Sequence, residues 1–175
     1  DALSESAETL TLTLSGVTGT AVLSAPSSAV ITIESDDPPA LVLNEIKINP
    51  AGSPDEPYEY VEIRGNPGET LPPGTLLVVF EGDSGTSLGF ADIVIDLGGQ
   101  TLGSNGLLIM KSSTGGHSLA SETTVVTDPL FTLSGGGLEN GTGTFALWFS
   151  PTTPFTEGTD YDTNNDGILE SPIDA

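Results

Sequence analysis

Residues 8 to 14 read Glu8-Thr9-Leu10-Thr11-Leu12-Thr13-Leu14, a strict alternation of polar and apolar side chains. In an extended strand successive side chains point to opposite faces, so the leucines share one face and the threonines the other. This pattern predicts a half-buried strand. The same two-residue period continues in Gly19–Leu23 and Ala29–Glu34, and the Gly-, Ser- and Pro-containing segments between these runs predict chain reversals.

The segment Asp36-Asp37-Pro38-Pro39 separates this first run of strands from the rest of the chain. Prolines supply no backbone donor and do not continue a β-ladder. We therefore expect one module over residues 1–38 and a second over residues 39–175. Seven further strand candidates follow: Leu41–Ile48, Tyr58–Arg64, Thr75–Glu81, Ile93–Leu97, Leu107–Lys111, Thr123–Val126 and Thr144–Ser150.

Two of these runs, Thr75–Phe80 and Phe145–Phe149, are apolar on both faces of the strand they would form. Such strands are covered on both sides, so we expect both to be central in their sheets. Gly- and Pro-rich connectors interrupt the second module at the spacing typical of a sandwich or barrel. The sequence thus predicts an all-β fold.

The net charge of the chain limits the classes of partner that it can bind. Its 175 residues include 25 acidic and 3 basic side chains, for a formal net charge of -22. Nucleic-acid binders neutralise phosphates with Lys and Arg, and Lys47, Arg64 and Lys111 do not make a basic footprint. We therefore expect no nucleic-acid partner and, by the same reasoning, no direct binding to anionic membranes.

The missing residue types are equally informative. The chain has no cysteine and a single histidine, His117, which excludes disulfides, thiol nucleophiles and paired-imidazole metal sites within it. Bound divalent cations would relieve the self-repulsion of so acidic a chain. The composition suits the calcium-rich medium outside cells, so we expect an extracellular or cell-surface location.

The sharpest chemical signal is the segment Asp160–Glu170, which reads DYDTNNDGILE. Alternating oxygen-bearing side chains followed by Gly are what a hard cation such as Ca²⁺ needs, because every second residue points inward and Gly permits a sharp turn. Aligned with positions 1, 3, 5 and 6 of an EF-hand loop, the ligands are Asp162, Asn164 and Asp166, with Gly167 at the turn. The Ile168 carbonyl and the Glu170 side chain then take positions 7 and 9.

The loop departs from that pattern at position 12, where Ile173 replaces the expected bidentate acid. Asp174 or Asp160 are the substitutes within reach. Without the bidentate acid we expect an affinity of about 10⁻⁴ to 10⁻³ M and a structural ion rather than a switch. The alternative is an acidic turn with no ion.

The first module resembles the C-terminal half of a Calx-beta domain, an immunoglobulin-like calcium-binding sandwich. The resemblance is carried by the acidic residues before Thr9–Ser15, by Gly19–Leu23, and by Ala29–Glu34 with the aspartates that follow it. It implies calcium at one end of the module and an apolar face that something else must complete. The alternative is that the acids only solvate loop ends. The implied ligands are Asp1, Glu5, Glu8, Asp36 and Asp37.

The second module resembles the lamin tail domain found in secreted bacterial proteins. The motifs that carry this likeness are Leu41–Ile46, Tyr58–Ile63, Leu71–Leu76 and Leu102–Leu108. The resemblance implies an immunoglobulin-like β-sandwich, used as an interaction module and ending here in an EF-hand-like or dockerin-like calcium loop. It implies no catalytic apparatus.

Glu45 and Glu62 could act as paired catalytic carboxylates, but their place in strand motifs favours structural hydrogen bonding. An enzyme would require a pocket that gathers Glu45, Glu62 and His117. We instead expect a non-catalytic, calcium-stabilised structural or adhesive module, cut from a longer polypeptide. Its open strand edges can pair with neighbouring copies or adjacent domains, building a fibre or surface layer. The alternative is an accessory module of a secreted nuclease or phosphatase.

Overall fold

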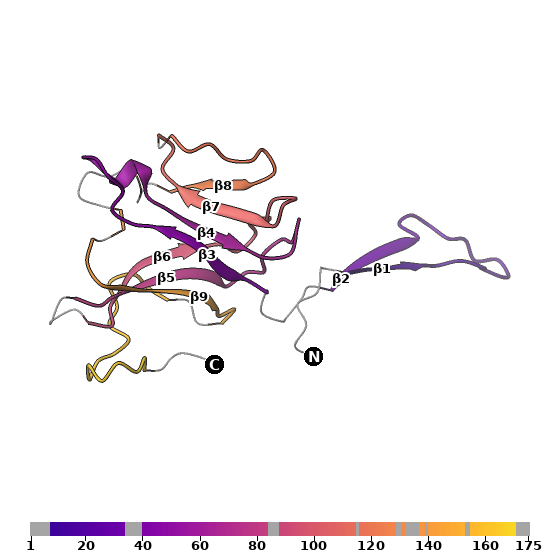
Figure 1. The fold of residues 1–175 in the computed structure, drawn as a ribbon. Helices are drawn as coiled ribbons and strands as arrows, with labels where there is room; N and C mark the ends of the chain where they lie inside the picture. Colours follow the sequence, from indigo (N-terminus) through magenta and orange to yellow (C-terminus); the bar gives the residue numbers. More distant parts are fainter. Residues whose placement is uncertain are drawn as a thin grey trace. The chain divides into compact units, whose positions relative to one another are not determined.

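The computed structural model describes residues 8–33, 40–83, 88–114, 116–128, 131, 137–138, 140–152 and 155–170. The chain divides into two compact units, Asp1–Asp37 and Pro38–Ala175, so the division falls within the Asp-Asp-Pro-Pro segment. Both units are built from strands, and the second also contains a 3₁₀ turn, η1 (Glu56–Tyr58) (Figure 1). No helix in this part of the chain has the length and hydrophobicity needed to cross a membrane.

The first unit is an antiparallel hairpin of β1 (Glu8–Thr13) and β2 (Ser28–Ile33). Leu10 pairs with Ile31 and Leu12 with Ala29, so the apolar side chains of both strands share one face. The prediction of a half-buried strand is wrong in this structure, because every residue of β1 and β2 is exposed. A two-stranded sheet has no second layer within its own unit to cover that face.

The expected strand Gly19–Leu23 is also absent from the described hairpin. Residues 19 and 20 form a turn and residues 21–24 have no regular structure. The ladder closes earlier, where the Leu14 amide donates to the Ser27 carbonyl over 2.8 Å. Gly16 and Gly19 take φ values of 68° and 84°, a left-handed conformation that a continuous strand does not accommodate.

The second unit contains two sheets. The four-stranded sheet has the order β3 (Val42–Lys47), β4 (Tyr60–Arg64), β7 (Leu107–Lys111), β8 (Thr124–Thr127). The three-stranded sheet has the order β6 (Ala91–Asp96), β5 (Thr75–Glu81), β9 (Gly143–Phe149). All pairs are antiparallel except β7 with β8. The predicted bounds are confirmed for β5 and β7 and differ by one to two residues for most others.

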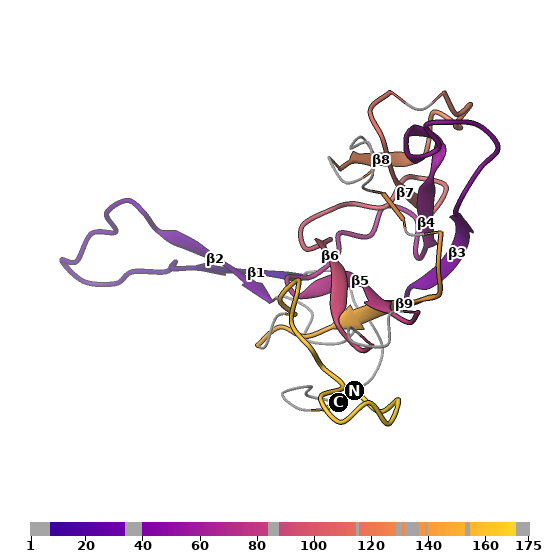
Figure 2. The same ribbon diagram turned by 90° about the vertical axis from the view of Figure 1, so that its left-hand side faces the viewer.

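The two sheets face each other across the main core (Figure 2). Val61 and Ile63 of β4 and Leu108 and Met110 of β7 are fully buried in one cluster with the inward residues of β5 and β6. The clustered residues of the three-stranded sheet are Leu77, Val79, Ile93 and Ile95. This arrangement confirms an all-β fold with two packed sheets.

A second apolar cluster covers the other face of the three-stranded sheet. Leu76, Val78 and Phe80 of β5 pack there with Phe155 and Tyr161 from the segment after β9. Six consecutive residues of β5 are therefore buried, alternating between the two clusters, which confirms the expected central strand. The prediction that β9 is also a central strand is wrong, since β9 lies at an edge of its sheet in the described structure. Its outward residues, Ala146 and Trp148, are covered in part by the C-terminal segment rather than by another strand.

Candidate calcium loop and neighbouring surfaces

The predicted calcium loop is attached to the three-stranded sheet at its base. Asp160 forms an isolated bridge with Phe90 just before β6. The Tyr161 amide donates to the Gly89 carbonyl over 3.0 Å, and the Ala91 amide donates to the Thr159 carbonyl over 2.9 Å. Gly89 has a φ of +79°, and a Cβ at that position would lie 2.4 Å from Asp162 Cβ. The sheet therefore fixes the start of the loop by backbone contacts that need glycine.

Asp162 lies at the centre of the loop and is only 5% exposed. Its Oδ1 accepts a hydrogen bond from the Asp166 amide at 3.0 Å, and its Oδ2 accepts one from the Gly167 amide at 2.8 Å. Asn164 Oδ1 also accepts from the Asp166 amide, at 2.9 Å. Positive φ values at Asn165 (57°) and Gly167 (83°) turn the chain around the carboxylate. The side chains of Asp162 and Asn164 thus meet at the backbone amide of Asp166, and the calcium binding that the spacing predicts stays a prediction.

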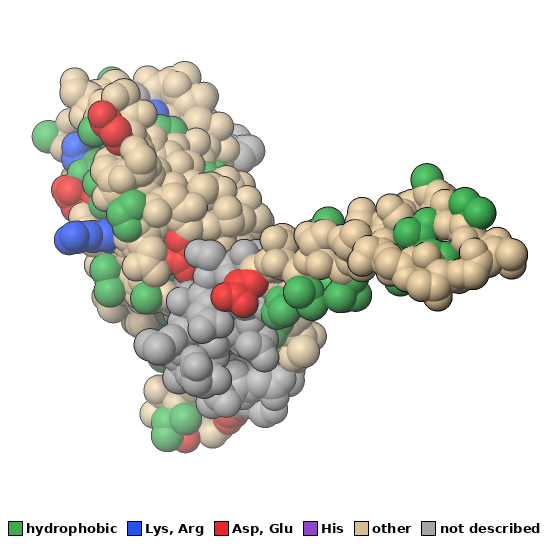
Figure 3. All heavy atoms as spheres, turned by 90° about the vertical axis from the view of Figure 1, so that its right-hand side faces the viewer, with side chains coloured by type: hydrophobic (Ala, Val, Ile, Leu, Met, Phe, Trp, Pro, Cys, Tyr) green, Lys and Arg blue, Asp and Glu red, His purple; other side chains and the backbone are tan. Residues whose placement is uncertain are grey.

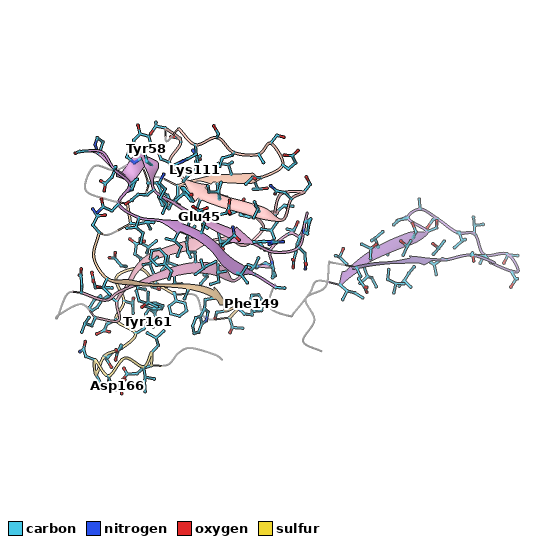
Figure 4. The ribbon with its side chains drawn as sticks, in the orientation of Figure 1. Glu45, Tyr58, Lys111, Phe149, Tyr161 and Asp166 are labelled. Atoms are coloured by element: carbon cyan, nitrogen blue, oxygen red, sulfur yellow. The ribbon has the colours of Figure 1, made fainter. Side chains whose placement is uncertain are left out.

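The side chains of Asp160 and Glu170, two further predicted ligands, accept hydrogen bonds from backbone amides of the same segment. Asp160 Oδ1 accepts from the Asp162 amide at 2.9 Å. Glu170 Oε2 accepts from both the amide, at 2.9 Å, and the hydroxyl of Thr163, which closes the loop. The Ile168 amide donates to Asp166 Oδ1 at 2.9 Å, and the Ile168 side chain is exposed. Figure 4 places Asp166 and Tyr161 at the same end of the three-stranded sheet.

The donor set suits a hard cation, because carboxylate and amide oxygens are its preferred ligands. In this structure, however, those oxygens are engaged by backbone amides, and within the described residues no group of three or more Asp, Glu or His side chains is arranged to hold a metal ion. Cation binding would thus draw Asp162, Asn164 and Asp166 closer than they are here. Asp162, which is already buried and held by two amides, would be the fixed point of that rearrangement.

The ligands implied by the Calx-beta resemblance are placed only in part. Asp1, Glu5, Asp36 and Asp37 lie outside the described residues, as does Asp174 of the loop's expected ligand set. Glu8 is the first residue of β1, where it is exposed and pairs with Ile33 across the hairpin.

A groove of about 620 Å³ runs between the 160–170 loop and the outer face of β5 and β9. Phe80, Trp148 and Leu169 line it together with Asp162 and Asp166. Trp148 packs edge-on against Phe155, with 5.2 Å between ring centroids. The loop and the second apolar cluster therefore adjoin each other. On neighbouring β6, burial and the charge of Glu81 raise the pKa of the Asp92 carboxyl.

Glu45 and Glu62, considered above as catalytic carboxylates, are paired neighbours on β3 and β4. Tyr60 Oη donates to Glu45 Oε1 over 2.6 Å, and Asn44 Nδ2 donates to Glu62 Oε1 over 2.6 Å. The hydrogen bond to Glu45, with burial and the charges of both glutamates, raises the pKa of Tyr60 to about 12. His117 packs edge-on against the same tyrosine, with 5.0 Å between ring centroids. The structure thus places Glu45, Glu62 and His117 near Tyr60. Both carboxylates accept hydrogen bonds from neutral donors.

Sequence reasoning missed Tyr58, Tyr60 and Lys111 as neighbours of His117. These residues come from η1, β4 and β7. They are far apart in the sequence and are brought together by the alignment of the strands, so no local sequence pattern could have predicted the contact. Comparison of the chain with protein-family models, with curated proteins and with solved structures found no match.

Proposed function

We propose that this chain is a non-catalytic structural or adhesive module of an extracellular or cell-surface protein, in which calcium stabilises a lamin-tail-like, immunoglobulin-like β-sandwich. The all-β fold with two packed sheets agrees with this proposal. The fixed carboxylates of Glu45 and Glu62 also favour a structural role, because each already accepts a short hydrogen bond from a neutral donor.

One observation carries the proposal: the Asp162 loop is continuous with the second apolar cluster. Tyr161, directly before Asp162, is buried in that cluster, and Leu169, near the end of the loop, packs against it. The Glu170 amide also donates to the Tyr161 carbonyl over 2.6 Å, which joins the two ends of the loop. An ion held between these ends would restrain the residues that cover β5, β6 and β9.

Thermal unfolding in calcium and in chelator tests this proposal. With about 5 mM calcium and a dissociation constant of about 0.5 mM, mass action stabilises the fold by about 1.4 kcal/mol. For a unit of this size that gain raises Tm by roughly 3–6 °C. Asp162→Asn and Asp166→Asn should lose most of the calcium-dependent rise.

The controls separate a specific ion from simple screening of the -22 charge. Glu122→Gln removes one exposed carboxylate from the connector before β8, far along the chain from the loop, and should keep the full calcium response. Sodium chloride at matched ionic strength should not reproduce that response. A Tm that calcium leaves unchanged, or an equal response from all three variants, would rule the proposal out.

We also propose that the β1–β2 hairpin associates with neighbouring copies. Leu10, Leu12, Leu14, Ile31 and Ile33 are 45–67% exposed and lie on one face. Figure 3 shows hydrophobic side chains gathered along the hairpin. Exposed apolar sheet faces and unpaired strand edges are both surfaces that associate in water.

Light scattering coupled to size exclusion, in chelator and in calcium, tests the association. The chain should form oligomers that dissociate on dilution, and Leu12→Ser should weaken them. Thr11→Ser changes the opposite face of the same strand and should have no effect. A wild-type chain that stays monomeric at high concentration under both conditions is the contradicting result.

A further inference from the structure

The few basic side chains of this acidic chain are concentrated at one place on the four-stranded sheet. The chain has three Lys and Arg residues and one His. Lys47 pairs with Tyr60 across β3 and β4, and Tyr60 pairs with Lys111 across β4 and β7. The amine of Lys47 lies 5.7 Å from the centre of the Tyr60 ring. Together with His117, three of the four basic side chains therefore surround Tyr60.

Lys111 is buried without a carboxylate partner in the described part of the chain. It is 7% exposed, and its amine donates to the Ser112 carbonyl over 2.5 Å. Among the acids close to it in the sheet register, Glu45 and Glu62 already accept from Tyr60 and Asn44. Asp128 follows Thr127, the β8 partner of Lys111, and its backbone amide donates to the Lys111 carbonyl over 3.3 Å. A buried amine normally has an anionic partner, because removing its charge from water is costly.

His117 adds an unpartnered nitrogen to the same place. Its Nε2 is buried and has no hydrogen-bond partner among the described residues. Its ring packs edge-on against Tyr60 and Tyr58, with centroid separations of 5.0 and 6.5 Å. Burial, followed by the charges of Lys47 and Lys111, lowers the pKa of the imidazole, while a backbone hydrogen bond with Tyr58 acts in the opposite direction. Figure 4 shows Lys111 and Tyr58 at the same end of this sheet.

We propose that Lys47, Lys111 and His117 form a binding site for a small oxyanion with a phosphate, sulfate or carboxylate group. Such an ion would accept hydrogen bonds from the two lysine amines and from a protonated His117 Nε2. It would supply the negative charge that Lys111 lacks and the partner that Nε2 lacks. The net charge of -22 disfavours anion binding over most of the chain's surface.

Binding at this site is coupled to one proton. An anion beside the imidazole favours the charged form, so it raises the pKa of His117 from its lowered value. By linkage, the anion binds more tightly at pH 5.5 than at pH 8, by about tenfold. Lys47, Lys111, Tyr58, Tyr60, Glu45 and Glu62 lie around the site, and Asp128 lies next to Lys111 on the β8 side. The hydrogen bonds of Glu45 and Glu62 go to Tyr60 and Asn44 rather than to the imidazole.

The test uses the resonances of the single histidine, which need no assignment by mutagenesis. His117 is titrated by NMR in chelator with sodium sulfate, with sodium acetate, and with sodium chloride at matched ionic strength. Sulfate or acetate should shift the imidazole resonances saturably and move the titration midpoint upward, and chloride should do neither. The stronger of the two responses distinguishes a tetrahedral oxyanion from a carboxylate. Because calcium is absent, failure here leaves the calcium proposal standing.

Variants identify the binding residues. Lys47→Gln and Lys111→Gln should each weaken sulfate or acetate binding about tenfold. Arg64→Gln removes the remaining strongly basic side chain, which is exposed at the far end of β4, and should leave binding unchanged. Lys47 is only half-buried, so Lys47→Gln should fold. It therefore still tests the site if the buried Lys111→Gln variant does not fold. Identical His117 titrations in all three salts, or equal losses in Arg64→Gln and Lys47→Gln, would overturn the proposed site.

Discussion

Glu59 is a buried carboxylate that ties together distant parts of the second unit. It is 1% exposed; its Oε2 accepts from the Leu138 amide at 2.8 Å and its Oε1 from the Asn49 amide at 3.3 Å. Asn49 has a φ of 48°, so the hydrogen bond fixes a turn that few residues adopt. The side chain thus links the segments before β4 and before β9.

Replacing Glu59 with Gln should destabilise the second unit by about 1–3 kcal/mol, because one acceptor oxygen becomes an amide donor facing a backbone N–H. Urea unfolding followed by circular dichroism measures the change. Glu122→Gln, at an exposed position, should stay within about 0.5 kcal/mol of the unaltered chain. Equal stability of the two variants would show that the buried hydrogen bonds of Glu59 contribute nothing.

Tyr60 gives a pH-dependent prediction. Its pKa is raised from 10.0 to about 12, chiefly by its hydrogen bond to Glu45. A raised pKa in the folded state means that this stabilising contribution is complete below pH 10 and is lost as the pH rises toward 12. Ultraviolet titration of the three tyrosines should show one late phase, absent in Tyr60→Phe and moved to lower pH in Glu45→Gln. A late phase that survives Tyr60→Phe would assign it to another tyrosine.

Local patterns predicted the residues of the loop but not those around Tyr60. The alternation Asp162, Asn164, Asp166 and the following Gly167 encode a short turn, so their convergence could be inferred directly. The contacts of Tyr60 with Lys47 and Lys111 depend on how strands β3, β4 and β7 are aligned. That alignment is set by burial of inward side chains far apart in the sequence, which a single sequence does not specify.

At the scale of the elements, two-residue periodicity located strands better than it predicted what covers them. β5 was recognisable as central because consecutive apolar residues need cover on both faces. The same composition in β9 was misleading, since a C-terminal loop segment, rather than a strand, packs on its outer side chains. In the hairpin, the pattern gave the pairing but could not supply the missing second layer.

Gly74 controls how β5 and β9 begin and end together. Its φ is +89°, its carbonyl accepts from the Ser150 amide at 2.9 Å, and a Cβ there would lie 2.5 Å from the Ser150 carbonyl oxygen. Gly74→Ala should therefore lower the free energy of unfolding by about 1–3 kcal/mol. Gly99→Ala, at a φ of +80° and with nothing within 4 Å of the added Cβ, is the matched control for urea unfolding. Similar curves for both variants would contradict the close approach.

For the molecule as a whole, the second unit is held by two apolar clusters on opposite faces of β5. The first lies between the two sheets and also includes buried residues of connecting segments, such as Leu71, Leu102 and Phe131. The second depends on Phe155, Tyr161 and Leu169, which belong to the segment that also forms the Asp162 loop. Calcium therefore acts, in our proposal, on the cluster whose cover is a loop rather than a sheet.

Amide hydrogen exchange in saturating calcium and in chelator tests this central claim most directly. We predict that calcium slows exchange about tenfold in the loop 160–170 and in β5 and β6, and that the hairpin 8–33 is unchanged as an internal reference. Asp162→Asn should abolish the difference. Equal exchange of the loop with and without calcium, or slowing spread evenly over both units, would contradict the account.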